Sequence, residues 1–202
     1  MKILNPQVSR DLDQGKSIKL DLGSGGPGRA GFYAVDHLAL EGVDIIADLN
    51  QRFDLLPDNC VSHIYSRHAL EHVDRLLPLM NELHRLTRAD GRIEIVVPHF
   101  SNVYGFSDPT HVRFFGLYSM YYFVARENQP SIRKVPSFYT NARFRIDKLT
   151  IEFYRSGAID KLIAPLLGRL INQSIHLQDF YERRLSGLFH AWQIRYLMRP
   201  EK

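Results

Sequence analysis

The first feature of this 202-residue chain that suggests a chemical function is a glycine-rich turn directly after a short apolar run. The run Ile18–Leu22 alternates apolar and polar side chains, which predicts a β-strand. Glycines 23, 25 and 26 follow it. Glycine allows a tight turn and lets a ligand approach the backbone closely. A strand that ends in such a turn, within an α/β pattern, indicates a nucleotide or nucleoside site at the carboxyl edge of a sheet.

The glycines at 23, 25 and 28 also satisfy the G-x-G-x-x-G fingerprint of dinucleotide binding, a weak signal by itself. The next predicted strand, 32–35, begins after a short gap that contains Pro27 and leaves no room for a helix. A dinucleotide needs that helix because the helix N-terminus stabilises the pyrophosphate. The pattern therefore favours a nucleoside without phosphate, such as S-adenosylmethionine (SAM).

Aspartates stand in or at the end of the first three predicted strands. Asp36 ends the second strand, where a carboxylate can accept hydrogen bonds from both ribose hydroxyls. Asp48 ends the third, predicted at 42–48, with Asp44 as a nearby competitor for the same role. Asp21 lies inside the first strand. Each has a plainer alternative, as a surface acid or as a carboxylate that binds only loop amides.

The rest of the chain alternates strands and helices. Further strands are predicted at 61–66, 92–98, 144–154 and 191–198, and helices at 70–88, 159–171 and 179–189. Asp90-Gly91 is predicted to end the first of these helices, and Pro165 lies inside the second. This alternation predicts an α/β fold with a doubly wound, mostly parallel sheet.

An aromatic-rich insertion, residues 99–141, follows the fifth predicted strand and carries the candidate catalytic residues. If the nucleoside is SAM and its methyl group is transferred to a hydroxyl, a base has to remove the hydroxyl proton, and histidine titrates near neutrality. We expect His99 or His111 to be that base, with Asp108 as its partner. The alternative is that these residues only hold the insertion in place.

Four short motifs together resemble those of class I SAM-dependent methyltransferases, in a small branch whose first helix is trimmed to a loop. They are Leu20–Gly25, Val35-Asp36, Ala47–Leu49 and Ser66–Val73, and the resemblance covers roughly residues 17–125. It implies one domain with a seven-stranded sheet whose last strand is antiparallel. It also implies cofactor contacts from Asp21, Gly23, Ser24, Gly25, Asp36, His37, Asp48, Leu49, Ser66 and His68.

The same resemblance divides the domain and suggests an acceptor. Residues 1–98 would form the cofactor half, 99–141 the acceptor-binding insertion and 142–202 the closing strands and helices. Chains with an Asp-Pro-Thr-His insertion, here Asp108–His111, resemble methyltransferases of cell-surface polysaccharide pathways. The expected reaction is O-methylation of a small-molecule or sugar-like acceptor, such as a nucleotide-sugar or glycan.

Charge is unevenly distributed along the sequence. Residues 1–125 hold 12 Lys/Arg against 15 Asp/Glu, and residues 126–202 hold 14 against 7, which together give the net charge of +4. A basic C-terminal third indicates an anionic partner or simply a solvated surface. The single cysteine, Cys60, excludes an internal disulfide and fits a cytoplasmic protein. No apolar run predicts a signal peptide or a membrane span.

Two other functions compete with a small-molecule methyltransferase. The basic third also fits a nucleic-acid methyltransferase, although no RNA-binding module is recognisable and nucleic acid is the less favoured partner. A non-catalytic SAM-binding protein could instead contact a membrane through the apolar face of 159–171, unless that face packs on the sheet. His68, His99, Asp108 and His111 could converge on a divalent cation, but their spacing matches no zinc or EF-hand signature, and no metal site is expected.

Overall fold

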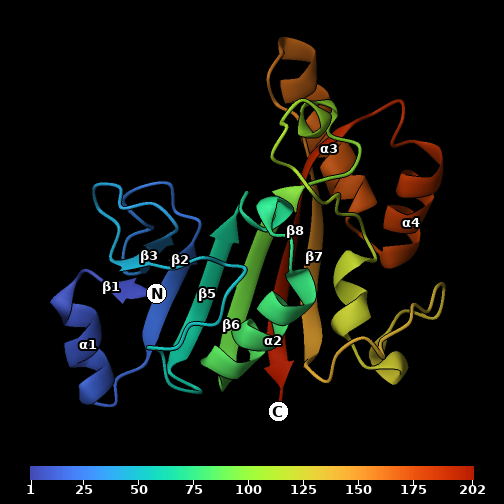
Figure 1. The fold of residues 1–202 in the computed structure, drawn as a ribbon. Helices are drawn as coiled ribbons and strands as arrows, with labels where there is room; N and C mark the ends of the chain where they lie inside the picture. The colour runs from blue at the N-terminus through green and yellow to red at the C-terminus, as the bar shows by residue number, and fades with distance from the viewer.

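The computed structural model describes residues 1–202, with the side chain of Ile159 left out. Its centre is one eight-stranded sheet in the order β1-β4-β3-β2-β5-β6-β8-β7 (Figure 1). Strands β4, β3, β2, β5 and β6 are parallel, and β8 runs antiparallel to both β6 and β7. The strands are β1 Lys2–Ile3, β2 Ile18–Leu22, β3 Tyr33–Asp36, β4 Ile45–Ile46, β5 Val61–Arg67, β6 Thr87–Pro98, β7 Arg143–Phe153 and β8 Ala191–Glu201.

The predicted mostly parallel sheet with an antiparallel last strand is confirmed, but its strand count of seven is wrong. The extra strand is β1, which pairs antiparallel with Ile45 and Ile46 at the sheet edge. Two residues cannot display the alternation that identifies a strand in a sequence. Helix α1, Pro6–Asp13, follows it and begins after Asn5, whose side chain accepts a hydrogen bond from the amide of Gln7.

The helix predicted at 70–88 is divided into two. A 3-10 turn, Leu70–His72, ends at Val73, whose backbone is extended, and helix α2 covers only Leu76–Leu86. Strand β6 starts directly at Thr87, so Asp90-Gly91 lies within the strand and does not end the helix. The stripe of apolar side chains from Leu70 onward predicts which face is buried, but it cannot show the break.

The two faces of the sheet differ in chemistry. One is apolar and packs into the main core with α2, for example through Ile64, Ile93 and Ile194. The other carries charged and polar side chains. The loop between β2 and β3 covers part of this polar face, with Phe32 edge-on to His63 and Arg29 over the ring of Tyr65. Aromatic and cation–π contacts thus hold this loop on the sheet.

The aromatic insertion contains three 3-10 turns, Val103–Phe106, Ser119–Phe123 and Arg126–Asn128. Its first part lies above the carboxyl ends of the parallel strands, whereas its later part lies beside the opposite end of β7 (Figure 1). There Phe123 is buried against Phe144 near the start of β7. The later part of the insertion is therefore part of the core.

Helices α3 (Ala158–Ile171) and α4 (Ile175–Arg184) complete the fold. Most of the apolar face predicted for α3 is exposed: Leu162 is 71% and Leu166 64% exposed, whereas Ile171 is buried. The Ile159 side chain, part of the same predicted face, lies outside what the structure describes. Among the described residues, no helix has the length and apolar character needed to cross a membrane.

Candidate cofactor and acceptor site

The glycine-rich turn connects β2 to the loop over the polar face. Gly23 has a φ of +68°, and a Cβ there would lie 2.3 Å from the Cβ of Ala69. The amides of Gly23 and Ser24 both donate to the carbonyl of Val35 on β3. Gly25, with a φ of +66°, donates its amide to Oδ2 of Asp36 at 2.9 Å. Only glycine satisfies both the dihedral angle and the close approach at position 23.

The acids at the strand ends have separate roles. Asp36 is buried, and its Oδ1 accepts the Leu38 amide at 3.0 Å, so both oxygens are held in fixed positions. Asp48 is exposed, and among the described residues its carboxylate accepts a hydrogen bond only from the Asn50 amide. Its competitor Asp44 is occupied structurally, by the Ala34 amide at 2.7 Å and the Asn5 side chain at 2.6 Å. Of these two rivals, Asp48 is the one that faces a cavity.

A cavity of about 740 Å³ lies at the carboxyl ends of β2, β3, β4 and β5. Its volume is within the range of small-molecule sites. Six of the residues that the resemblance implies line it: Gly23, Asp36, His37, Asp48, Leu49 and His68. Sequence reasoning did not assign the other lining residues, which are Ala47, Asn50, Ala69, His72, Val73 and Thr110.

The remaining residues expected at the cofactor support the turn and do not line the cavity. Asp21 accepts the Arg29 amide at 2.8 Å, and burial raises the pKa of its carboxyl group. The hydroxyl of Ser24 donates to the carbonyl of Gly26. Ser66 is fully buried and donates to the carbonyl of Leu22, which ties the end of β5 to the end of β2.

His68 directly follows β5 and has a φ of +53°, an unusual value for a residue other than glycine. Its Nε2 lies 2.8 Å from Oε1 of Gln193 on β8, and burial lowers the pKa of its imidazole. Strained backbone of this kind persists where the surroundings hold it and is concentrated at functional sites. His68 is thus fixed at the cavity wall.

The Asp108–His111 segment packs onto the 3-10 turn that carries Glu71 and His72. His111 Nδ1 donates to the Gly105 carbonyl at 2.8 Å, and its Nε2 lies 3.7 Å from Asp108 and 4.0 Å from Glu71. The rings of His111 and His72 are 4.8 Å apart. Two segments far apart in the sequence therefore meet beside the cavity. In the sequence, Glu71-His72 is an isolated pair within a predicted helix, and nothing near it indicates contact with the Asp108–His111 segment.

Comparison with known proteins identifies the fold and the domain. Residues 33–95 match the family model described as a methyltransferase domain. This match covers less than half of the chain and shows that it carries a SAM-dependent methyltransferase domain. SAM is therefore its cofactor. No curated protein sequence matches this methyltransferase significantly.

Two solved structures share the fold of this methyltransferase. A SAM-dependent methyltransferase from Archaeoglobus fulgidus aligns with a TM-score of 0.55 and 16% identity, over 97% of this chain and 92% of that one. The YcgJ protein from Bacillus subtilis aligns with a TM-score of 0.51 and 15% identity, over 93% of each chain. At these identities the likeness shows the fold.

His99, one of the two expected bases, lies away from the cavity of this methyltransferase. It is 1% exposed, and its Nε2 lies 3.0 Å from Glu182 of α4 while its Nδ1 lies 2.8 Å from the Ser101 hydroxyl. Both ring nitrogens are therefore engaged. The ring ties the start of the insertion to α4, and the structure does not bring it together with His111.

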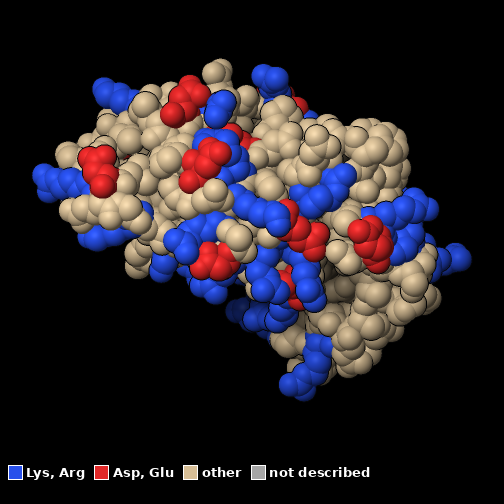
Figure 2. All heavy atoms as spheres, turned by 90° about the horizontal axis from the view of Figure 1, so that it is seen from below, with Lys and Arg blue, Asp and Glu red and all other residues tan. Residues whose placement is uncertain are grey.

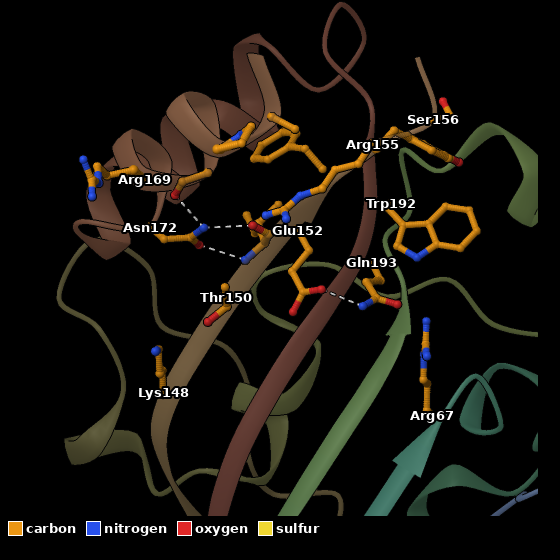
Figure 3. A pocket seen from close by; sticks show the side chains of 16 residues that line it. Arg67, Lys148, Thr150, Glu152, Arg155, Ser156, Arg169, Asn172, Trp192 and Gln193 are labelled. Atoms are coloured by element: carbon orange, nitrogen blue, oxygen red, sulfur yellow. Dashed lines mark hydrogen bonds between the residues drawn. The ribbon is translucent and has the colours of Figure 1, made fainter. Parts of the chain in front are cut away.

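A second cavity, of about 890 Å³, lies between β7, β8 and α3 (Figure 3). Gln193 lines it and donates to Glu152 at 2.6 Å. Because Gln193 also contacts His68, one hydrogen-bonded pair separates the two cavities. The indole of Trp192 forms part of the wall. Four cationic side chains surround the space: Arg67, Lys148, Arg155 and Arg169.

Proposed function

We propose that this methyltransferase transfers the methyl group of SAM to a hydroxyl of a small, anionic, sugar-like acceptor. The observation that carries the proposal is the pair of adjoining cavities. One is lined by strand-end acids and the glycine turn, and the other by cations and an indole. An acceptor that spans the His68–Gln193 boundary would place its anionic part among the cations and its hydroxyl beside the cofactor.

The first cavity fits an adenosyl group. The fixed carboxylate of Asp36 would accept hydrogen bonds from the ribose hydroxyls, with His37 beside it. Asp48 would bind the adenine amino group, next to the Leu49 amide. The backbone of the Gly23–Gly25 turn would contact the methionine part of SAM. Asp21 would support this turn by accepting the Arg29 amide. Ser24 and Ser66 would contribute by holding this turn.

SAM supplies an electrophilic methyl group on a sulfonium, and the protein has to align the acceptor and receive its proton. The acceptor oxygen forms a bond to the methyl carbon as the sulfur–carbon bond breaks, and the hydroxyl proton goes to a base. We assign the base to His111, with Asp108 beside it, and not to His99, because His111 adjoins cavity-lining His72. Alignment supplies most of the rate.

The anionic character of the acceptor is argued from the second cavity. The only carboxylate among the residues lining it, Glu152, already contacts Gln193 and the guanidinium of Arg195 at 2.9 Å. Its charge is therefore offset, whereas Arg67, Arg155 and Arg169 remain to bind an anion. Trp192 offers an apolar surface of the kind on which a sugar ring can pack. A sugar phosphate or nucleotide-sugar of a cytoplasmic polysaccharide pathway has this chemistry.

A nucleic-acid acceptor is the less favoured proposal. Figure 2 views the molecule from below and shows basic and acidic side chains interspersed, without a continuous basic surface. Several cations of the chain are paired, such as Arg199 with Asp147 at 2.7 Å and Arg85 with Asp58 at 2.6 Å. Nucleic-acid binding needs cations that are free to replace counterions. The pairing supports a small acceptor instead.

Calorimetric titration with SAM tests the cofactor half of the proposal. Asp36→Ala should weaken SAM binding at least tenfold, about 1.4 kcal/mol, because the ribose loses its acceptor. Asp44→Ala is the control: it removes an acid that binds Ala34 and Asn5 and does not line the cavity, so it should lower stability and spare SAM affinity. Equal SAM affinity in wild type and Asp36→Ala would exclude the assigned site.

Labelled-methyl transfer tests the acceptor half. Wild type is incubated with labelled SAM and separate sets of sugar phosphates, nucleotide-sugars, neutral sugars and RNA. The expected result is label on an anionic sugar, lost in Arg67→Ala and Arg155→Ala with SAM affinity unchanged. Transfer to RNA that weakens steeply with salt would overturn the small-acceptor proposal.

A further inference from the structure

We propose that Glu71, His72 and His111 bind a divalent transition-metal ion at the wall of the SAM cavity. The three side chains offer one ligand atom each, and these atoms lie within 4.8 Å of one another. Glu71 and His72 belong to the 3-10 turn that follows β5 in the sequence, and His111 belongs to the insertion that follows β6. The role of the ion in catalysis depends on the function proposed above, but ion binding itself does not.

The buried carboxylate of Glu71 is the first observation. Glu71 is 1% exposed, and neither of its carboxylate oxygens has a hydrogen-bond partner among the described residues. Its nearest basic group is Nε2 of His111 at 4.0 Å, beyond hydrogen-bond range. A buried carboxylate without a partner is costly unless a cation or a proton neutralises it.

The tautomer of His111 is the second observation. Its Nδ1 lies 2.8 Å from the Gly105 carbonyl, which can only accept, so Nδ1 carries the hydrogen. In the neutral ring, the lone pair is then on Nε2, the atom near Glu71 and Asp108. The lone pair of His111 Nε2 therefore faces the carboxylate oxygens of Glu71 and Asp108, which are also acceptors, and the described residues offer no donor to pair them. Metal-binding histidines are commonly held by such a bond from the other ring nitrogen.

His72 is held in a similar way. The Thr110 hydroxyl donates to Oδ1 of Asp108 at 2.6 Å, so it receives the Nδ1 hydrogen of His72 at 2.9 Å. This leaves the lone pair of His72 on Nε2. Asp108 is therefore both a support for His72 and a further carboxylate near the site, with Oδ2 at 3.7 Å from His111.

The spacing fits a shared cation better than hydrogen bonds. Separations of 3.7 and 4.0 Å around His111 Nε2 are too long for hydrogen bonds. Two bonds of about 2.1 Å to one ion can span them. Two imidazoles and one carboxylate suit Mn²⁺, Fe²⁺, Co²⁺ or Zn²⁺ rather than Ca²⁺, which prefers oxygen ligands alone.

The position gives the ion a role. His72 and Thr110 line the SAM cavity, so the ion would face the space for the acceptor. Once its Nε2 lone pair binds the ion, His111 cannot also take the acceptor's proton, so in this arrangement the ion would replace His111 as the activating group. The ion would lower the pKa of a bound acceptor hydroxyl, whose proton would pass to the neighbouring Asp108 carboxylate or to water. The acceptor class then narrows to sugars with a hydroxyl free to bind a cation.

Metal titration of the untagged, chelator-treated full chain tests the site without any acceptor. Calorimetry with Zn²⁺ and Mn²⁺, and visible absorbance with Co²⁺, should show one ion per chain. Glu71→Gln, which keeps the shape but not the charge, and His111→Asn should each weaken binding at least tenfold while SAM affinity is retained. His176→Asn, an exposed histidine on α4, is the matched control and should bind as wild type does.

Two results would overturn the proposal. One is no ion binding by wild type at millimolar concentration. The other is wild-type affinity in Glu71→Gln, which would mean that a proton neutralises Glu71. Methyl transfer that survives chelation would overturn the catalytic role alone. One bound ion with no transfer to any acceptor would confirm the metal site while contradicting the proposed function.

Discussion

At the residue scale, neighbouring glycines of the turn are needed for different reasons. Gly23 and Gly25 share a positive φ, but only Gly23 lies against a neighbour, Ala69. A Cβ at Gly25 would meet nothing within 4 Å. The sequence pattern treats the two as equivalent because both match the same motif. Their local surroundings distinguish dihedral strain from steric collision.

This difference predicts unequal effects of substitution. Gly25→Ala should cost roughly 1–2 kcal/mol of unfolding free energy from its dihedral strain alone. Gly23→Ala adds a collision with Ala69 at 2.3 Å, so it should cost more and also reduce SAM affinity. Urea unfolding and SAM titration measure both effects. Equal costs would mean that the turn moves away from Ala69 freely.

At the element scale, Asn172 at the end of α3 protects the exposed edge of the sheet. Its Oδ1 accepts the Ile151 amide and its Nδ2 donates to the Ile151 carbonyl, each at 2.8 Å. Strand β7 is the last in the sheet, so these backbone groups have no neighbouring strand. A side chain takes the place of a ninth strand there, which blunts an edge open to aggregation.

Removing this protection should be costly. Asn172→Ala leaves both backbone groups of Ile151 unpaired, and we expect a loss of about 2–3 kcal/mol in unfolding free energy. Hydrogen exchange at the Ile151 amide should accelerate more than exchange at the central strand β5. The exposed Leu166→Ala, on the same helix, is the control and should change stability little. Similar losses in the two variants would contradict the edge role.

At the scale of the whole molecule, the polar face of the sheet makes stability depend on pH. Burial, and then the charge of Arg92, lower the pKa of His63 to about 4 from its ordinary 6.5. Glu94 opposes this shift, while Arg29 and Lys19 add to it. Between these two pH values the unfolded chain binds a proton that the folded chain does not. Unfolding free energy should therefore rise as pH increases from about 4 to 6.5.

Substitution isolates this contribution. His63→Gln cannot take up the proton, so the slope of unfolding free energy against pH should fall by up to about 1.4 kcal/mol per pH unit within that window. Urea unfolding of both proteins at intervals from pH 4 to 7 measures the difference. Parallel curves would show that His63 is protonated equally in the folded and unfolded chain.

The sequence alone determined the elements whose signal is local. The strand at Ile18–Leu22 and its glycine turn were predictable, as was β5, because alternation and glycine act through neighbouring residues. Asp36 was likewise predictable as the last residue of β3, whereas the strand predicted at 42–48 is only Ile45–Ile46, so Asp48 lies beyond its end. Strand β1 was not predictable because two residues have no periodicity, and the break at Val73 was not because an apolar stripe continues across it.

Only the tertiary structure decided which of these residues share a site. His99 and His111 look alike in the sequence, yet one is enclosed against α4 and the other meets Glu71. The Asp44 and Asp48 carboxylates likewise separate into a structural and a cavity-facing acid. The hydrogen-bond partners Glu182 of His99 and Thr110 of His72 lie 83 and 38 residues away in the chain. No local pattern encodes such distances, so the chemistry of this site follows from packing.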